Sequence, residues 1–122
     1  MITTMKLFLT PMVLAVTLAA CGGGEAAKEA PQAAQDMVRI RTMEDSLFNA
    51  TAYDQRKAQT LLDAYKAFAT THPLDTMAPE ILFRAAGLAK SMRDPEQSIF
   101  LYDRIITDYP SWYRLPDVYY LK

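Results

Sequence analysis

The side chains in this chain that could carry chemistry are one thiol, one imidazole and scattered carboxylates. Cys21 is the only cysteine and His72 the only histidine. A single cysteine excludes an internal disulfide and a multi-cysteine zinc site. The sequence also lacks a glycine-rich phosphate loop, a Ser-His-Asp set and a His-Glu-x-x-His pattern. We therefore expect no catalytic residue, no metal, no cofactor and no enzyme activity.

His72 follows a stretch of helical periodicity, at a position where a positive side chain interacts favourably with the helix dipole. A metal site here would have to recruit aspartate or glutamate, and the nearest carboxylates, Asp75 and Glu80, fit better as helix caps. We predict a structural role for His72. The handling of a metal or small molecule through His72 stays open as an alternative. Glu44 and Asp45 are interpreted as a helix surface, with acid–base chemistry as the alternative.

The N-terminal residues have the composition of an export sequence. A polar start that contains Lys6 precedes a largely apolar run of twelve residues, Leu7–Leu18, and small residues follow. This order is typical of a secretory signal, and the apolar run is too short to cross a bilayer comfortably. We predict a signal peptide over residues 1–20. A buried apolar segment is the alternative.

The end of this segment, Leu18-Ala19-Ala20-Cys21, resembles the lipobox of bacterial lipoproteins. The resemblance implies that the Cys21 thiol takes a diacylglyceryl group, that the signal is cut before Cys21, and that the new amine is acylated, with palmitate as a typical chain. More than one acyl chain gives stable anchoring to a membrane. Gly22, where related lipoproteins of the inner membrane carry aspartate, implies the outer membrane. An unlipidated signal peptide is the alternative.

Residues 21–35 after the signal contain little that could fill a core. Gly22–Gln35 is rich in glycine, alanine and mixed charge and includes Pro31, so we predict a flexible tether. The formal net charge of the whole chain is −1. That charge gives no basic surface for nucleic acid, and we expect no nucleic-acid partner.

Residues 36–122 have helical periodicity throughout, which predicts an all-α domain. Prolines end the helices before each loop and open the helices after it. Small residues around Gly87 predict that the helix from Pro79 closely approaches a neighbouring helix. In the helix that follows Asp94, Ile99 is predicted to lie on the buried face. The expected helices are Asp36–Asn49, Gln55–Thr71, Pro79–Met92, a helix capped by Asp94 that ends before Pro110, and a helix from Pro116.

The same pattern occurs twice in this domain. A shift of 37 residues places each member of the first copy on its counterpart in the second. A fixed period in the range of about 20–50 residues is typical of solenoids built from helix pairs. We therefore predict antiparallel helical hairpins, incomplete at the C-terminal end of the chain. The residues that define the repeat are Tyr65 with Tyr102, Pro73 with Pro110, and Pro79 with Pro116.

The block Tyr-x-x-Phe, His-Pro and Ala-Pro-Glu-x-Leu-Phe-x-Ala-Ala, with the second copy's Tyr109-Pro110, resembles tetratricopeptide-like (TPR-like) repeats. Together with the lipobox, it is most similar to the BamD-type lipoprotein of the β-barrel assembly machinery and to the Tol-Pal-associated coordinator. The resemblance implies a lipid-anchored scaffold that faces the periplasm and binds an outer-membrane or periplasmic protein in outer-membrane assembly. A Tol-Pal role in envelope division and a spacer without a partner are the alternatives.

Aromatic residues near the C-terminal end are the candidates for partner binding. Tryptophan and tyrosine contribute much of the binding energy in protein interfaces. Packing against a neighbouring helix is the alternative for the same side chains. The candidates are Trp112, Tyr113, Tyr119 and Tyr120.

Overall fold

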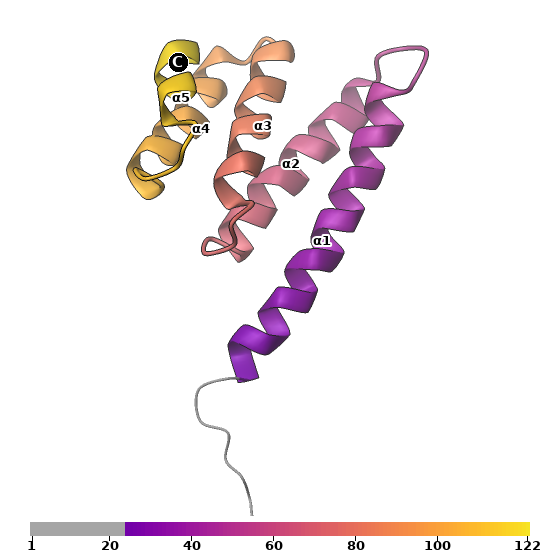
Figure 1. The fold of residues 1–122 in the computed structure, drawn as a ribbon. Coiled ribbons are helices and arrows are strands. Elements are labelled where there is room, and N and C mark those ends of the chain that lie inside the picture. Colours follow the sequence, from indigo (N-terminus) through magenta and orange to yellow (C-terminus); the bar gives the residue numbers. More distant parts are fainter. Residues whose placement is uncertain (1–23) are drawn as a thin grey trace, which may run out of the picture.

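The computed structural model describes residues 24–122, which form five α-helices (Figure 1). No strand occurs in this range, so the all-α prediction is confirmed for residues 24–122. The predicted signal peptide and Cys21 lie outside the described residues. The helices are α1 (Gly24–Phe48), α2 (Gln55–Thr71), α3 (Ala78–Ser91), α4 (Pro95–Asp108) and α5 (Leu115–Leu121).

Each helix packs against the next one along the chain, from α1 on α2 to α4 on α5. Figure 1 shows this order in space, with α1 at one side of the molecule and α4 and α5 at the other. An amphipathic helix must bury its apolar stripe against a neighbour. The core is accordingly a series of layers between consecutive helices, with Leu61, Tyr65, Ile81 and Ile105 among its fully buried members.

The prediction of a flexible tether is wrong where α1 replaces it. The helix begins at Gly24 rather than Asp36, so residues 24–35 are helical and not a flexible linker. Ala33 is 3% exposed. The buried face of α1 therefore extends into residues 24–35, although this segment contains no bulky apolar side chains. Alanine, glutamate and glutamine, which dominate this segment, are good helix formers. Pro31 lies inside the helix, where it removes one backbone donor.

α2 has the predicted bounds. Its N-cap is Asp54, whose Oδ1 accepts the backbone N–H groups of Arg56 and Lys57 at 2.9 and 3.2 Å. Such a cap satisfies donors that the first helical turn leaves without partners. The apolar stripe predicted for this helix is buried. Its members are Ala58, Leu61, Leu62, Tyr65, Phe68 and Ala69.

α3 has apolar residues on two sides because it packs against both α2 and α4. Ala85 and Ala86 are fully buried between these neighbours. The reason predicted for Gly87 is wrong, however, since an added Cβ at this position would meet nothing within 4 Å. Gly87 is therefore not required by a close helix approach.

α4 starts as predicted, with Asp94 as its N-cap and Pro95 in the first turn. Asp94 Oδ1 accepts the Gln97 backbone N–H at 3.1 Å, and the Gln97 side-chain amide donates to Asp94 Oδ2 at 3.0 Å. The predicted burial of Ile99 is wrong, because its side chain is 41% exposed. The buried face is turned by one residue and places Ser98 against the core instead.

The predicted period of 37 residues recurs in the conformation of two loops. His72 ends α2 with φ −122° and ψ 58°, and Tyr109 ends α4 with φ −129° and ψ 56°. The Asp75 N–H donates to the His72 carbonyl at 3.1 Å, and the Trp112 N–H donates to the Tyr109 carbonyl at 3.1 Å. The N-termini of α2 and α4 do not follow this period, because their caps, Asp54 and Asp94, are 94 − 54 = 40 residues apart. The repeat therefore covers the helix ends and the loops.

Candidate functional site

Trp112 lies in the loop after α4 and is partly buried. Its ring meets that of Phe83 edge-on, with centroids 5.6 Å apart, and that of Tyr113 at 5.7 Å. The guanidinium of Arg114 sits over the Phe83 ring, 4.3 Å from its centroid. This cluster anchors the loop to α3. Trp112 therefore has the packing role that was the alternative to partner binding, while part of its surface remains accessible.

The other three candidates for partner binding are exposed. Tyr113 is 81% exposed, Tyr119 61% and Tyr120 89%. Phe100 on α4, 66% exposed, belongs to the same C-terminal part of the fold and was not singled out from the sequence. α5 buries Val118 alone among its residues. The last two helices therefore present several large aromatic side chains to solvent.

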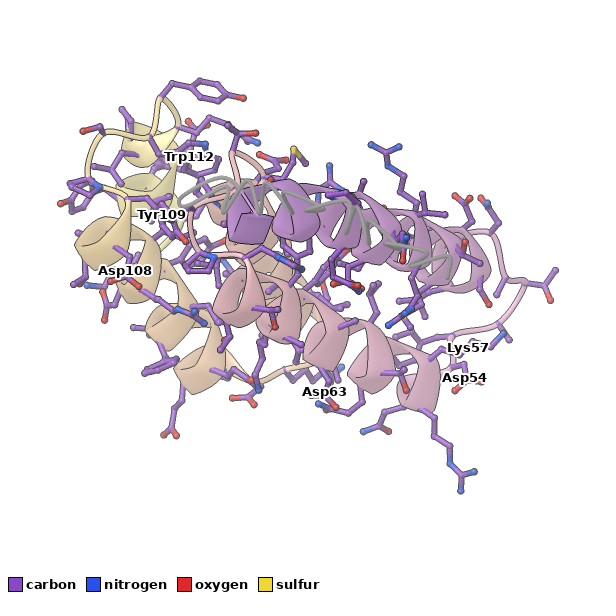
Figure 2. All side chains as sticks on the ribbon, turned by 90° about the horizontal axis from the view of Figure 1, so that it is seen from below. Asp54, Lys57, Asp63, Asp108, Tyr109 and Trp112 are labelled. Atoms are coloured by element: carbon purple, nitrogen blue, oxygen red, sulfur yellow. The ribbon has the colours of Figure 1, made fainter. Side chains whose placement is uncertain are left out.

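A groove lies between the two loops that repeat. Its volume is about 540 Å³, and Figure 2 shows that Asp108, Tyr109 and Trp112 lie at the same end of the molecule. The Tyr109 hydroxyl donates to the Pro73 carbonyl at 2.7 Å and so ties the second loop to the first. The lining residues are Pro73, Leu74, Asp75, Thr76, Pro79, Asp108, Tyr109, Pro110, Ser111 and Trp112.

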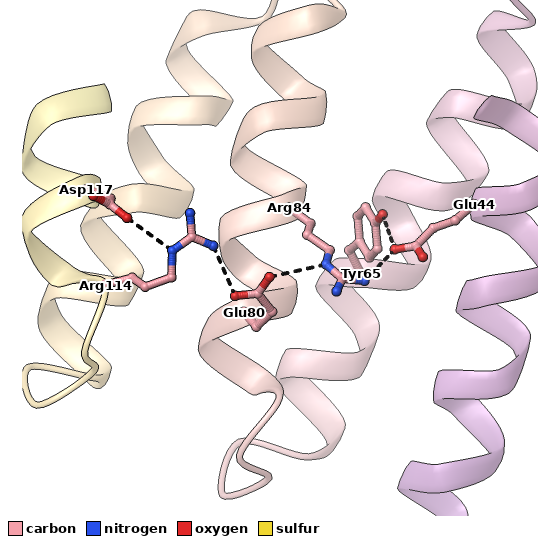
Figure 3. Close-up of polar contacts among 6 residues, drawn as sticks. All are labelled: Glu44, Tyr65, Glu80, Arg84, Arg114 and Asp117. Atoms are coloured by element: carbon pink, nitrogen blue, oxygen red, sulfur yellow. Dashed lines mark hydrogen bonds and ion pairs between the residues drawn. The ribbon is translucent and has the colours of Figure 1, made fainter.

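Polar contacts connect α1 to α3 (Figure 3). Glu44 Oε1 on α1 accepts the Tyr65 hydroxyl at 2.7 Å and Arg84 Nη1 at 2.8 Å. Burial and the hydrogen bond to Glu44 raise the pKa of Tyr65 above its ordinary range, so the phenol remains a proton donor. Tyr102, the counterpart of Tyr65 in the repeat, is equally buried at 2% exposure but has no such carboxylate partner among residues 24–122.

The contacts continue from α3 to α5. Arg84 Nε lies 3.5 Å from Glu80 Oε1, and Arg114 Nη1 lies 3.5 Å from Glu80 Oε2. Arg114 Nε also bonds to Asp117 at 3.1 Å. Glu80 is thus an ion-pair partner in the first turn of α3 rather than the predicted cap. In the sequence, this role of Glu80 is indicated only by the repeat, because another acidic residue, Asp117, lies 37 residues further on, in the first turn of α5.

His72 is 2% exposed, and its Nε2 lies 2.8 Å from Asp36 Oδ2. Asp36 belongs to α1, 36 residues earlier, and the sequence around His72 points only to the nearer carboxylates, Asp75 and Glu80. The hydrogen bond with His72 is the main reason that the pKa of Asp36 lies below its usual value. Asp75 instead accepts the Met77 backbone N–H at 2.8 Å within the loop. The geometry of His72 is that of a link between helices.

Among residues 31–122, whose side chains the structure describes, no group of three or more histidine, cysteine, aspartate or glutamate side chains could hold a metal ion. Glu44 is engaged with Tyr65 and Arg84, as described above. Over the same residues, no helix is both long enough and apolar enough to cross a membrane.

Comparisons with protein-family models, with curated proteins and with solved structures found no match to this chain.

Proposed function

We propose that this protein is a lipid-anchored scaffold of the bacterial outer membrane that binds a partner protein on the periplasmic side. The observation that carries the proposal is the exposure of Tyr113, Tyr119 and Tyr120 on the last loop and helix. Large aromatic side chains are enriched where proteins bind one another.

The repeated helix ends and loops support the part of the proposal that concerns the fold. In this proposal the helices are antiparallel TPR-like hairpins, and the two copies meet through Tyr109 and Pro73. Helical repeat proteins form extended surfaces and bind partners through them. The resemblance of the sequence to periplasmic assembly lipoproteins favours a partner in outer-membrane protein assembly.

The anchor is proposed from the residues around Cys21. Cells that express the chain in the presence of radiolabelled palmitate should incorporate label into it, and Cys21→Ser should abolish the incorporation. The labelled protein should fractionate with the outer membrane. Ala20→Gly keeps a small residue before the cysteine and serves as the control that retains the label. An unlabelled native chain would contradict the lipid anchor.

The partner is tested by affinity purification of the full chain from detergent-solubilised envelopes. Recovery of a β-barrel assembly protein supports the proposed role. Recovery of Tol-Pal proteins in its place would move the function to envelope division. A chain that recovers neither group would contradict both roles.

A further inference from the structure

We propose that the groove between the two repeated loops binds an extended, proline-containing segment of a partner protein that carries lysine or arginine. The groove is the one formed by residues 73–79 and 108–112. The inference rests on the proposed function, because it presumes that the protein binds a partner, and it adds the chemistry of the bound segment.

The apolar part of the groove suits proline. Pro73, Pro79 and Pro110 line it together with the rings of Tyr109 and Trp112. Grooves lined by aromatic residues bind proline-rich segments in the polyproline II conformation, because that conformation exists before binding and costs little entropy to fix. The hydrogen bond from the Tyr109 hydroxyl to the Pro73 carbonyl holds the two walls together at 2.7 Å. The groove is therefore preformed.

Trp112 supplies a hydrogen-bond donor for such a segment. No residue between 24 and 122 accepts a hydrogen bond from its indole N–H, although its backbone N–H is bonded to the Tyr109 carbonyl. A polyproline II segment has no internal hydrogen bonds, so its carbonyls are available as acceptors. Buried indole N–H groups in interfaces usually find such an acceptor. The tryptophan thus matches an extended backbone better than a helix, whose carbonyls are already bonded.

The charge of the groove selects a basic segment. Two carboxylates, Asp75 and Asp108, are among the lining residues, and no lysine, arginine or histidine is. Asp108 is 51% exposed, and its closest cation, Arg104, is 3.7 Å away. Arg114 is engaged with Glu80 and Asp117. Complementary charge contributes to specificity by disfavouring partners of like charge. A lysine or arginine beside the prolines is the complement to these carboxylates.

The fluorescence of Trp112 provides a direct assay, since Trp112 is the only tryptophan in the chain. The probe is a peptide of about twelve residues built from Pro-Pro-Lys triplets, which adopts polyproline II. Titration into the full chain should shift the Trp112 emission in a saturable way. Peptides of Pro-Pro-Glu and of Gly-Gly-Lys triplets test charge and conformation separately. We expect each of these two peptides to bind at least about tenfold more weakly than the Pro-Pro-Lys peptide.

Matched variants locate the binding. Asp108→Asn should weaken the Pro-Pro-Lys peptide by about two- to fivefold, the range expected for one exposed charge pair. Asp63→Asn is the control, because Asp63 is also an exposed helical aspartate and lies away from the groove in Figure 2. Its affinity should equal that of the unchanged protein. Circular dichroism of each variant establishes that it is folded.

Three results would overturn the inference: no response of Trp112 to the Pro-Pro-Lys peptide, equal binding of the Pro-Pro-Glu peptide, or equal effects of Asp108→Asn and Asp63→Asn. Any of these would leave the proposed function intact if affinity purification still recovers its partner. Recovery of no assembly or Tol-Pal protein, with peptide binding as expected, would overturn the proposed cellular role and not the groove.

Discussion

His72 and Asp36 join the end of α2 to α1 through a hydrogen bond of 2.8 Å. The pKa of Asp36 is below its usual value, mainly because of this bond. A carboxylate with a lowered folded-state pKa stabilises the fold above its unfolded-state pKa. It loses that contribution as the pH falls through the folded-state value. The pair should therefore contribute to stability at neutral pH and fail in acid.

Asp36→Asn tests this. The variant should lower the free energy of unfolding by about 1–2 kcal/mol near neutral pH, since it removes a hydrogen bond to a charged group. The difference between the two proteins should shrink below about pH 4, where the unfolded carboxyl becomes protonated. Urea unfolding at neutral and acidic pH measures both quantities. A difference that does not change on acidification would contradict the assignment of the stabilising charge to Asp36.

Gly87 provides a test of helix propensity without a change in packing. Nothing lies within 4 Å of a Cβ built at this position, and glycine inside a helix is less favourable than alanine. Gly87→Ala should raise the free energy of unfolding by about 0.5–1 kcal/mol. Thermal unfolding followed by circular dichroism measures the change. Ala86→Gly, at the buried position before it, should have the opposite sign. A destabilised Gly87→Ala protein would show that α3 approaches a neighbour there more closely than described.

Single residues show where prediction from the sequence succeeded. The sequence predicts Tyr65 and Ile105 in the core, because apolar residues at helical spacing must share one face, and both are buried. The prediction is wrong for Ile99, because both Ser98 and Ile99 fit that spacing and side-chain size favours the isoleucine. The partner of His72 could not be found, because Asp36 lies in another helix and nothing local indicates the contact.

Glu44 joins α1 to α2 and α3 through Tyr65 and Arg84. The repeat supplies a built-in comparison, since Tyr102 is as buried as Tyr65 but has no carboxylate partner in the described part of the chain. The hydroxyl of Tyr65 should therefore contribute to stability, and that of Tyr102 should not.

The two tyrosine-to-phenylalanine variants measure this difference. Tyr65→Phe should cost about 1–2 kcal/mol in the free energy of unfolding, as expected for a hydrogen bond to a carboxylate. Tyr102→Phe keeps the ring and its edge contact with Phe83. Its effect should stay within about 0.5 kcal/mol. Equal losses in urea unfolding would mean that the hydroxyl bond to Glu44 carries no stability.

The bounds of the helices follow from local chemistry where caps and prolines are present. The predicted bounds of α2 and α4 are confirmed, because Asp54, Asp94 and the prolines after each helix fix their ends. The sequence does not predict the start of α1, because the first residues of this helix are small or polar. Such residues are compatible with a tether, and only packing of Ala33 against the fold distinguishes the two.

For the whole molecule, the sequence predicted that two similar units follow one another, but not the groove between them. The position of each loop can be predicted from its prolines and from the end of the helix before it. The groove depends on how the copies lie side by side, and this is set by α3, which packs on both α2 and α4. The contact of Tyr109 with Pro73 then fixes the spacing of the loops. Contacts between residues so far apart in the chain cannot be predicted from one amino-acid sequence.

We propose that the exposed side chains of Tyr113, Tyr119 and Tyr120 bind a protein of the outer-membrane assembly machinery. Tyr119 and Tyr53 are matched probes, since they are 61% and 64% exposed but lie on α5 and in the loop before α2. A photo-crosslinking amino acid placed at each position in cells should capture an assembly protein from position 119 and not from position 53. Failure to capture it from position 119, or equal capture from both positions, would show that these tyrosines do not bind an assembly protein.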